Sequence, residues 1–134
     1  MKVKFLNPDV TKLPDVMRLG YSPRVDFGMR VDREYVVYAV SMWKSVLHYL
    51  VIPENTSLPF WYPAAIFQVT DQRVPSSWYF GHPFGGDGTD VAFELGYEEI
   101  VRNMRHSDDL VERETEAIRI FLARKDEIER SLPD

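Results

Sequence analysis

The sequence predicts an α+β fold, in which a small twisted antiparallel sheet or a partly open SH3-like barrel is followed by C-terminal helices. Residues 31–95 form short runs of aromatic and β-branched residues separated by Pro-, Gly- and Asn-containing turns, which is typical of strands. From residue 97 the apolar period changes from about 2 to about 3.6, which indicates helix. The 134 residues suit one domain, 1–134, with an irregular lead-in over 1–30 and a helical tail over 97–132.

The elements follow from local sequence. Three prolines and a glycine between residues 7 and 24 predict the irregular lead-in. Residues 34–43 are dense in Val, Tyr and Trp and predict one strand, and residues 46–52 predict a second. Lys44-Ser45 between them predicts a tight turn, so the two strands form a hairpin.

The rest of the β-rich middle divides by the same criteria. Pro and Asn mark loops, clustered glycines mark a longer loop, and short aromatic or β-branched runs mark strands. The predicted elements are a loop over 53–59, a strand over 60–62 stopped by Pro63, a strand over 66–71, a long loop over 80–90 and a strand over 91–95 that closes the sheet.

The tail predicts one or two helical turns over 97–104 and then a long amphipathic helix over 107–131. Ser107 is the expected N-cap, because Asp108 and Asp109 follow it in the first turn, where the helix dipole favours acidic residues. A break near Glu114 is the alternative to one continuous helix. The apolar stripe comprises Leu110, Val111, Ala117, Ile118, Phe121, Leu122, Ile128 and Leu132.

Composition excludes several classes of protein. The absence of cysteine excludes a disulfide scaffold, a thiolate zinc site, an iron–sulfur cluster and a Cys nucleophile. No apolar run approaches the roughly 18 residues that a membrane span requires, and the first residues do not resemble a signal peptide. We therefore expect a soluble, cytoplasmic protein that has no membrane partner.

Charge is distributed unevenly along the chain. Residues 1–50 hold eight Lys/Arg against five Asp/Glu, a balance of +3, whereas residues 51–134 hold eight against sixteen, a balance of −8. Nucleic-acid binding usually requires clustered basic residues, which are missing here, so no nucleic-acid partner is expected. The acidic half suits either a solvated surface or attraction toward a basic protein partner.

Candidate chemical sites are weak. The glycine-rich segment 81–90 matches neither a dinucleotide nor a P-loop pattern, and its Asp87 and Asp90 make a poor cation cage. The three histidines, His48, His82 and His106, lie far apart and show no metal-ligand spacing. No catalytic residue, metal or cofactor is therefore expected, although an enzyme using His82 or His106 with Asp90 or Asp108 remains a third hypothesis.

Aromatic residues cluster in two triplets, 60–62 and 78–80. Consecutive side chains on a strand face opposite ways, so each triplet presents a large ring away from the core unless helices cover both faces. Exposed Trp and Tyr are typical of protein interfaces, which makes Trp61, Trp78 and Tyr79 candidate anchors. The alternative is that both triplets belong to a core closed by the tail helix.

The runs 61–71 and 75–80 resemble a short family of uncharacterised bacterial cytosolic proteins, and the segments 96–100 and 117–122 continue the similarity. The resemblance covers most of residues 35–122. Such proteins are similar to the small immunity or accessory proteins encoded beside polymorphic toxins. The resemblance implies a binding role and transfers no catalytic residue.

The leading hypothesis is a non-enzymatic protein-binding domain of the immunity type, which neutralises a basic toxin domain by occluding it. The alternative is a small-ligand or peptide-binding barrel that uses the groove near the 81–90 loop. Oligomeric state stays open. The residues predicted to bind the partner are Trp61, Trp78, Tyr79, Asp87, Asp90, Glu98, Glu99, Asp108 and Asp109, with Glu112 adding to the acidic surface.

Overall fold

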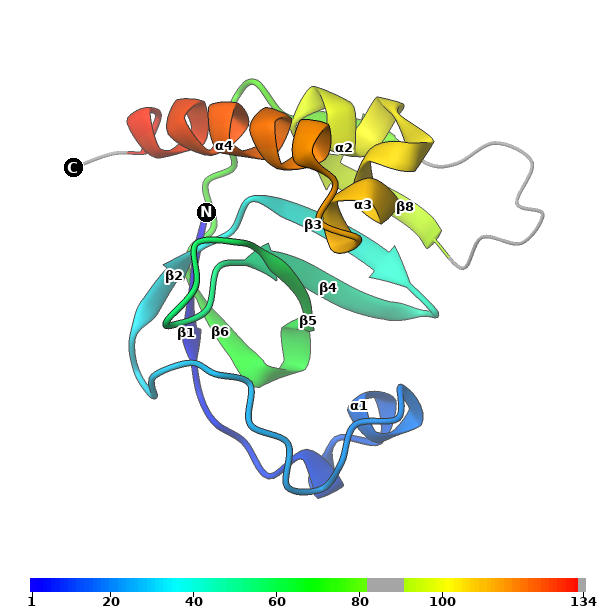
Figure 1. The fold of residues 1–134 in the computed structure, drawn as a ribbon. Helices are drawn as coiled ribbons and strands as arrows, with labels where there is room; N and C mark the ends of the chain where they lie inside the picture. The colour runs from blue at the N-terminus through cyan, green and yellow to red at the C-terminus, as the bar shows by residue number, and fades with distance from the viewer. Residues whose placement is uncertain (82–90, 133–134) are drawn as a thin grey trace.

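The computed structural model describes residues 1–81 and 91–132, apart from the side chain of Met104, and has the predicted α+β class (Figure 1). Strands fill the first two-thirds of the chain and helices the last third. The elements are β1 (Lys2–Phe5), η1 (Val10–Lys12), α1 (Pro14–Arg18), β2 (Glu34–Val36), β3 (Ala39–Trp43), β4 (Val46–Val51), β5 (Phe60–Pro63), η2 (Ala64–Ile66), β6 (Phe67–Asp71), β7 (Tyr79–Gly81), β8 (Val91–Gly96), α2 (Glu98–Arg102), α3 (Met104–Val111) and α4 (Thr115–Arg130).

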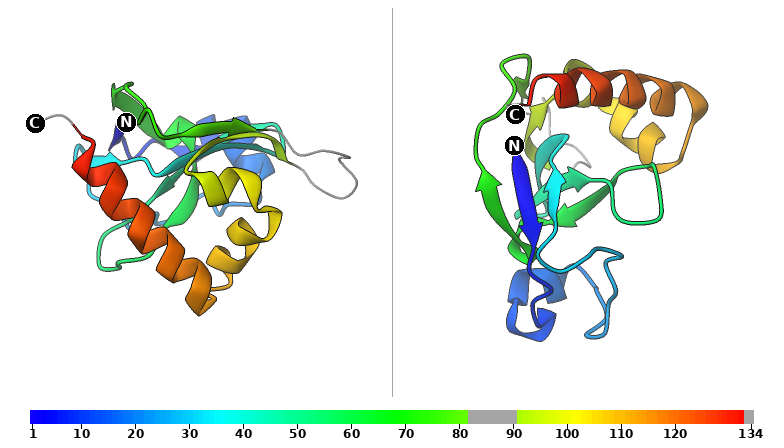
Figure 2. Two further views of the ribbon diagram at one scale, coloured as in Figure 1. Left: turned by 90° about the horizontal axis from the view of Figure 1, so that it is seen from above. Right: turned by 90° about the vertical axis from the view of Figure 1, so that its left-hand side faces the viewer.

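The strands form two antiparallel sheets rather than one. A three-stranded sheet has the order β2-β1-β6, and a five-stranded sheet has the order β5-β4-β3-β8-β7. The helices α2, α3 and α4 lie on one side of the five-stranded sheet, and α4 crosses over that sheet at an angle (Figure 2). The strand β3 is central, since it pairs with β4 on one side and β8 on the other.

One hydrophobic core lies between the two sheets. Phe5 and Phe67 of the smaller sheet join Val40, Tyr49 and Tyr62 of the larger sheet in one buried cluster. The rings meet mainly edge-to-face, as in the Phe5–Phe67 pair, whose centroids are 6.2 Å apart. This packing holds the inner face of the five-stranded sheet and leaves its other face for the helices.

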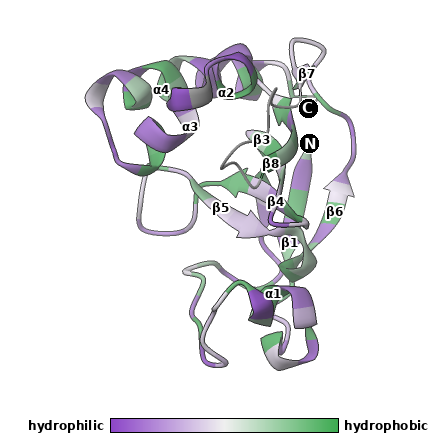
Figure 3. Cartoon of the chain, turned by 90° about the vertical axis from the view of Figure 1, so that its right-hand side faces the viewer, coloured by the Kyte–Doolittle hydropathy of each residue, from purple (hydrophilic) through white to green (hydrophobic). Residues whose placement is uncertain are grey.

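A second core joins the outer face of the five-stranded sheet to the helices. Leu50 of β4 packs there with Ile100, Leu110, Ala117 and Phe121, whereas its neighbour in the sequence, Tyr49, belongs to the first core. Successive strand residues face opposite sides, which is why apolar residues of β4 point to both cores, with His48 as the polar exception. Hydrophobic and hydrophilic residues alternate along α4, as an amphipathic helix requires (Figure 3).

Two predictions for the N-terminal half were wrong. The lead-in is not irregular throughout, because residues 2–5 form the central strand of the smaller sheet and residues 14–18 a short helix. The predicted strand over 34–43 is two strands, β2 and β3, which lie in different sheets. The hairpin is confirmed: Lys44 and Ser45 both have positive φ, 50° and 62°, as a tight two-residue turn requires.

The helical tail is broken where the alternative prediction placed the break. The helix α3 ends at Val111 and α4 begins at Thr115, and Arg113 between them has a φ of 62°. Ser107 is not an N-cap, because α3 begins earlier, and the side chain of Asn103 caps it by accepting from the Arg105 N–H at 3.1 Å. No helix in the described ranges is both long and apolar enough to cross a membrane.

The first two residues of the predicted loop over 80–90 are in a strand instead. Phe80 and Gly81 belong to β7, and residues 82–90 lie outside the described residues. The strand β8 does not close the sheet, because it lies between β3 and β7, and β7 forms the edge.

Candidate functional site

A cavity of about 310 Å³ lies between the outer face of the five-stranded sheet and α3, and we call it the helix-side cavity. Its volume is at the lower end of the range usual for small-molecule sites, about 300–1,000 Å³. Strands, a helix and the segment after α1 all contribute. It is lined by Tyr21, Ser41, Trp43, His48, Trp61, Val91, Glu94, Ser107, Asp108 and Val111.

Three of the lining residues form a polar row across three strands. Ser41 of β3 lies directly opposite His48 of β4 and directly opposite Glu94 of β8. Directly paired residues project from the same face of an antiparallel sheet, about 4.5–5.5 Å apart at Cβ. The row Glu94–Ser41–His48 therefore faces the helices, and all three residues line the helix-side cavity.

His48 is a buried, neutral imidazole. Its side chain is 2% exposed, and its Nδ1 lies 2.8 Å from the carbonyl oxygen of Val46. A carbonyl only accepts, so Nδ1 carries the proton and Nε2 keeps its lone pair. Burial lowers the pKa of His48 below its ordinary value of 6.5, and the imidazole ring meets Trp43 edge-on, with centroids 5.5 Å apart. His48 therefore offers an acceptor, Nε2, that bonds to no other described residue.

Glu94 is a carboxyl group without a partner. Burial, followed by the negative charge of Asp108, raises the pKa of Glu94 to about 7. No described residue forms a hydrogen bond or ion pair with the Glu94 side chain. Two acidic side chains, one from β8 and one from α3, thus line one cavity without a cation of the described chain between them.

An indole–hydroxyl hydrogen bond fixes one wall of the cavity. The Nε1 of Trp61 donates to the hydroxyl of Ser107 at 3.3 Å, which ties β5 to α3. The corner after α3 is tied to the same strand, because Arg113 donates to the Pro59 carbonyl at 2.9 Å and its guanidinium stacks on Phe60. These contacts hold α3 above the sheet and keep the cavity open.

The helix-side cavity is rich in acceptors and poor in donors. Glu94, Asp108 and His48 Nε2 accept, whereas the donors among the lining side chains are hydroxyl groups, such as that of Ser41, and the indole N–H groups of Trp43 and Trp61, of which that of Trp61 already donates to Ser107. Within the described ranges no three His, Asp or Glu side chains converge closely enough to hold a metal ion. The arrangement suits an organic ligand better than a single metal ion.

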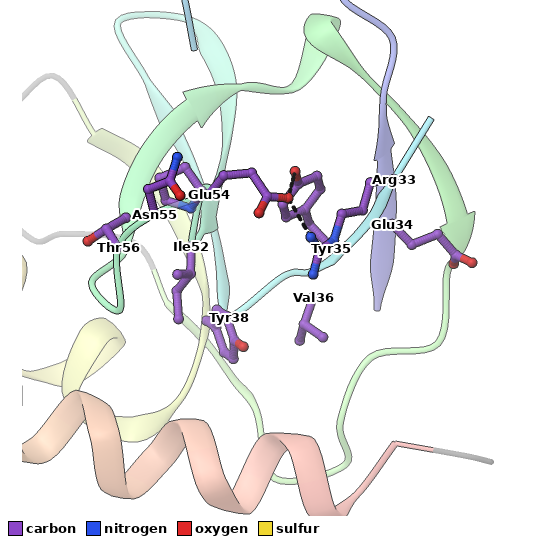
Figure 4. Close-up of a pocket in the computed structure, with 10 residues that line it drawn as sticks. Arg33, Glu34, Tyr35, Val36, Tyr38, Ile52, Glu54, Asn55 and Thr56 are labelled. Atoms are coloured by element: carbon purple, nitrogen blue, oxygen red, sulfur yellow. Dashed lines mark hydrogen bonds and ion pairs between the residues drawn. The ribbon is translucent and has the colours of Figure 1, made fainter. Parts of the chain in front are cut away.

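A second hollow of about 330 Å³, which we call the Glu54 groove, lies between β2 and the loop after β4 (Figure 4). Its Glu54 side chain is engaged in two hydrogen bonds. Glu54 accepts from Arg33 at 2.7 Å and from the Tyr35 hydroxyl at 2.8 Å, and that hydroxyl in turn accepts from the Arg30 N–H. These bonds connect the loop to β2, so the groove has a structural explanation that the helix-side cavity lacks.

The predicted aromatic anchors have three different environments. Trp61 is partly buried and lines the helix-side cavity. Trp78 is partly buried against both cores, and its indole N–H has no hydrogen-bond partner among the described residues. Tyr79 is exposed and stacks under the guanidinium of Arg102, 4.5 Å away. The structure does not bring the three rings together into one patch.

The predicted acidic residues are also dispersed. Glu98 and Glu99 pair with Arg124 of α4, and the closer contact, Glu99 to Arg124 Nε, is 2.8 Å. Asp108 lines the helix-side cavity, whereas Asp109 does not. Glu112 is exposed at the end of α3. Asp87 and Asp90, with His82, lie outside the described residues.

His106 has a structural partner rather than a catalytic one. It is 2% exposed, its Nε2 is hydrogen-bonded to the Tyr97 hydroxyl at 2.6 Å, and burial lowers its pKa. It does not line either hollow with Asp108. The hypothesis of an enzyme built on His106 and Asp108 therefore gains no geometric support.

Sequence reasoning missed Ser41 and Glu94 and dismissed His48. A signal was present: a two-residue turn at 44–45 sets the register, and this register places Ser41 opposite His48. Two polar residues that face each other in an apolar hairpin indicate a site or a buried polar contact. Glu94 gave a weaker signal, as a single charge in the short apolar strand 91–95.

Comparisons of the chain with protein-family models, curated proteins and solved structures find no match. The resemblance to immunity proteins thus stays a prediction. The functional argument rests on the residues of the chain itself.

Proposed function

We propose that the protein is a non-enzymatic binding domain that holds its ligand in the helix-side cavity. One observation carries the proposal: polar groups of Glu94, Ser41 and His48 face one cavity and make no hydrogen bond there with any described residue. These groups are open to the cavity, because the buried side-chain N/O atom that lacks a partner within the described ranges is Trp78 Nε1 and none of theirs. Water can therefore contact them, and a ligand that enters the cavity would replace that water. A bound ligand would supply the missing partners.

The geometry favours binding over catalysis. A nucleophile needs a base within hydrogen-bond reach, and the base needs a group that orients it. Ser41 makes no hydrogen bond to His48, and the group behind His48 Nδ1 is a backbone carbonyl instead of a carboxylate. A carbonyl fixes the tautomer but adds no negative charge to stabilise an imidazolium.

Toxin neutralisation is the second candidate function, and a specific feature favours it. The mouth of the helix-side cavity carries two exposed apolar side chains, Val111 at 59% and Trp43 at 38%, next to the acidic Asp108. An aromatic and aliphatic surface with acidic neighbours suits a basic protein that inserts one side chain. In this form the cavity is the centre of the interface.

A ligand screen on two matched variants tests the binding proposal. Val111→Trp places a large ring at the mouth of the cavity, and Leu122→Trp makes the same kind of change on α4, at an exposed site that does not line the cavity. We expect compounds from a mixed library of cationic, neutral and anionic molecules to raise the melting temperature of the wild type and of Leu122→Trp, but not of Val111→Trp.

Two results would contradict the binding proposal. One is a library in which nothing binds the wild type, and the other is binding that Val111→Trp leaves intact. For the toxin candidate, co-expression with the product of the neighbouring reading frame should give a stable complex that Val111→Trp weakens by more than tenfold. A complex that forms equally well with Val111→Trp would place the interface elsewhere.

A further inference from the structure

We propose that the helix-side cavity recognises an aliphatic ammonium group, carried either by a free amine or by a lysine side chain of a partner protein. The inference rests on the binding function proposed above and names the chemistry of its ligand. Four features of the cavity support it: its hydrogen-bonding inventory, its aromatic walls, the separation of its acceptors and its uncompensated charge.

The hydrogen-bonding inventory calls for a donor. Glu94 and Asp108 present carboxyl oxygens, and His48 presents the lone pair of Nε2. Among the residues that the structure describes, no lysine or arginine lines the cavity, and His48 is neutral at pH 7 because burial lowers its pKa. A carboxylate or phosphate ligand would meet two acidic side chains without a cation, whereas an ammonium supplies three donors and a positive charge.

Aromatic rings supply the apolar part of the site. Trp43, Trp61 and Tyr21 line the cavity, and an ammonium is attracted to the face of such rings, most strongly to Trp. The chain already shows this contact at the rim, where the Nζ of Lys44 lies 4.7 Å from the centroid of the Trp43 ring. The carbon chain that bears a bound ammonium would pack against the same walls.

The arrangement of acceptors favours an ammonium over a guanidinium or a metal ion. The acceptors come from three different elements: Glu94 from β8, His48 from β4 and Asp108 from α3. Separate acceptors suit the three diverging N–H bonds of an ammonium, whereas the planar fork of a guanidinium pairs best with a single carboxylate. The described His, Asp and Glu side chains do not form a metal-binding group.

Glu94 shows the charge that the ligand would compensate. Burial and the neighbouring Asp108 raise the pKa of its carboxyl to about 7, which is the response of a carboxylate that is taken out of water without a cation. The two buried polar residues beside it, Ser41 at 4% and His48 at 2% exposure, have acceptor atoms with no described partner. The site therefore combines two acidic side chains with two buried polar residues, which a pair of acidic residues on the surface would lack.

The test is a titration of the full chain with matched probes at pH 8, followed by NMR chemical shifts. The probes are n-butylammonium, neutral 1-butanol, anionic butyrate and n-butylguanidinium. We expect n-butylammonium to bind most tightly and to shift the signals of the Trp43 and Trp61 indoles. Glu94→Gln should weaken n-butylammonium binding at least tenfold, because a charge-assisted hydrogen bond becomes a neutral one.

Asp126→Asn is the matched control for that charge change. Asp126 is exposed on α4, makes no ion pair to a described residue and does not line the cavity, so its variant should bind n-butylammonium within twofold of the wild type. Equal weakening in both variants would indicate general charge attraction and overturn the proposal. Asp108→Asn gives a second variant of the site, which should also bind more weakly.

The outcomes separate the ligand class from the proposed function. If butanol, butyrate or n-butylguanidinium binds more tightly than n-butylammonium, and Val111→Trp abolishes that binding, the proposal of an ammonium ligand is wrong. The proposed binding function would still stand. Absence of binding by every probe and every library compound would overturn both. The source is assigned by a capped Gly-Lys-Gly peptide: affinity at least tenfold above n-butylammonium indicates a lysine of a protein, and equal affinity indicates a free amine.

Discussion

The helix-side cavity and the Glu54 groove have nearly the same volume, about 310 and 330 Å³, and Glu94 lines the first whereas Glu54 and Glu34 line the second. Glu54 and Glu94 differ in their partners. Glu54 accepts from Arg33 and from the Tyr35 hydroxyl (Figure 4), whereas Glu94 has no described partner and a pKa raised to about 7. Volume alone therefore does not identify a site.

The difference has a physical basis. A carboxylate that accepts two hydrogen bonds, one of them from a guanidinium, contributes to the stability of the loop that carries it. A carboxylate held out of water without such bonds opposes folding at neutral pH. The hydrogen bonds of Glu54 thus stabilise the fold. In the helix-side cavity, by contrast, the carboxyl group of Glu94 is left for a ligand to bind. Three predictions test this contrast.

The largest change in stability is expected from a substitution of Glu54 in the Glu54 groove. Glu54→Ala removes the acceptor of the buried Tyr35 hydroxyl and the partner of Arg33, and it should lower the free energy of unfolding by about 2–3 kcal/mol. Most of the loss comes from Tyr35, because Arg33 is half exposed and such ion pairs contribute little. Urea denaturation measures it. Glu54→Gln, which still accepts both bonds, should lose less than half as much, and equal losses would contradict the assignment.

Replacing Glu94, in contrast, is expected to raise the free energy of unfolding. Folding raises the pKa of this group from its ordinary 4.5 to about 7, so the folded state binds its proton more tightly than the unfolded chain does. The tighter proton binding of folded Glu94 contributes fully to the free energy of unfolding below about pH 4.5. This contribution is lost as the pH rises through 7, because Glu94 then loses its proton in the folded state as well. Glu94→Gln imitates the protonated form, so the variant should be more stable than the wild type by roughly 2 kcal/mol at pH 8 and by nearly nothing at pH 4.

Urea denaturation of both proteins at the two pH values measures this difference. Comparing variant with wild type removes the opposite pH dependence of His48 and His106, whose lowered pKa values make stability fall as the pH falls below about 6.5. Asp126→Asn, which removes a charge at an exposed site outside the cavity, again provides the control. A Glu94→Gln variant that is less stable than the wild type at pH 8 would mean that Glu94 has a partner in the folded protein.

The sequence predicted the parts of the fold that depend on local chemistry. The apolar period predicted the helix α4, turn residues predicted the β3–β4 hairpin, and the strand expected over 46–52 is found over 46–51. The break between α3 and α4 was open at that stage, and the positive φ of Arg113 decides it. These features depend on neighbours in the chain, which a single sequence displays.

What the sequence did not predict depends on contacts between distant residues. The four residues of β1 alternate polar and apolar, but the run is short, and their pairing with β2 and β6 is what makes them the centre of a sheet. The exchange of sheets between β2 and β3 is likewise decided by partners far along the chain. Of the candidate site, Asp108 and Trp61 were predicted as binding residues, but Glu94 joins them only because β8 pairs with β3.

The smallest changes in stability are expected from removing the hydroxyl groups of Tyr35 and Ser41. The Tyr35 hydroxyl donates to Glu54 and accepts from the Arg30 N–H, so Tyr35→Phe should cost about 1–2 kcal/mol in the free energy of unfolding. The Ser41 hydroxyl has no described partner, so Ser41→Ala should change stability by less than about 0.5 kcal/mol. Ser41→Ala should nevertheless weaken ligand binding, because the hydroxyl faces the cavity. A loss of stability in Ser41→Ala as large as that in Tyr35→Phe would show that Ser41 serves the fold, and the helix-side cavity would then lose one of the unsatisfied groups that distinguish it from the Glu54 groove.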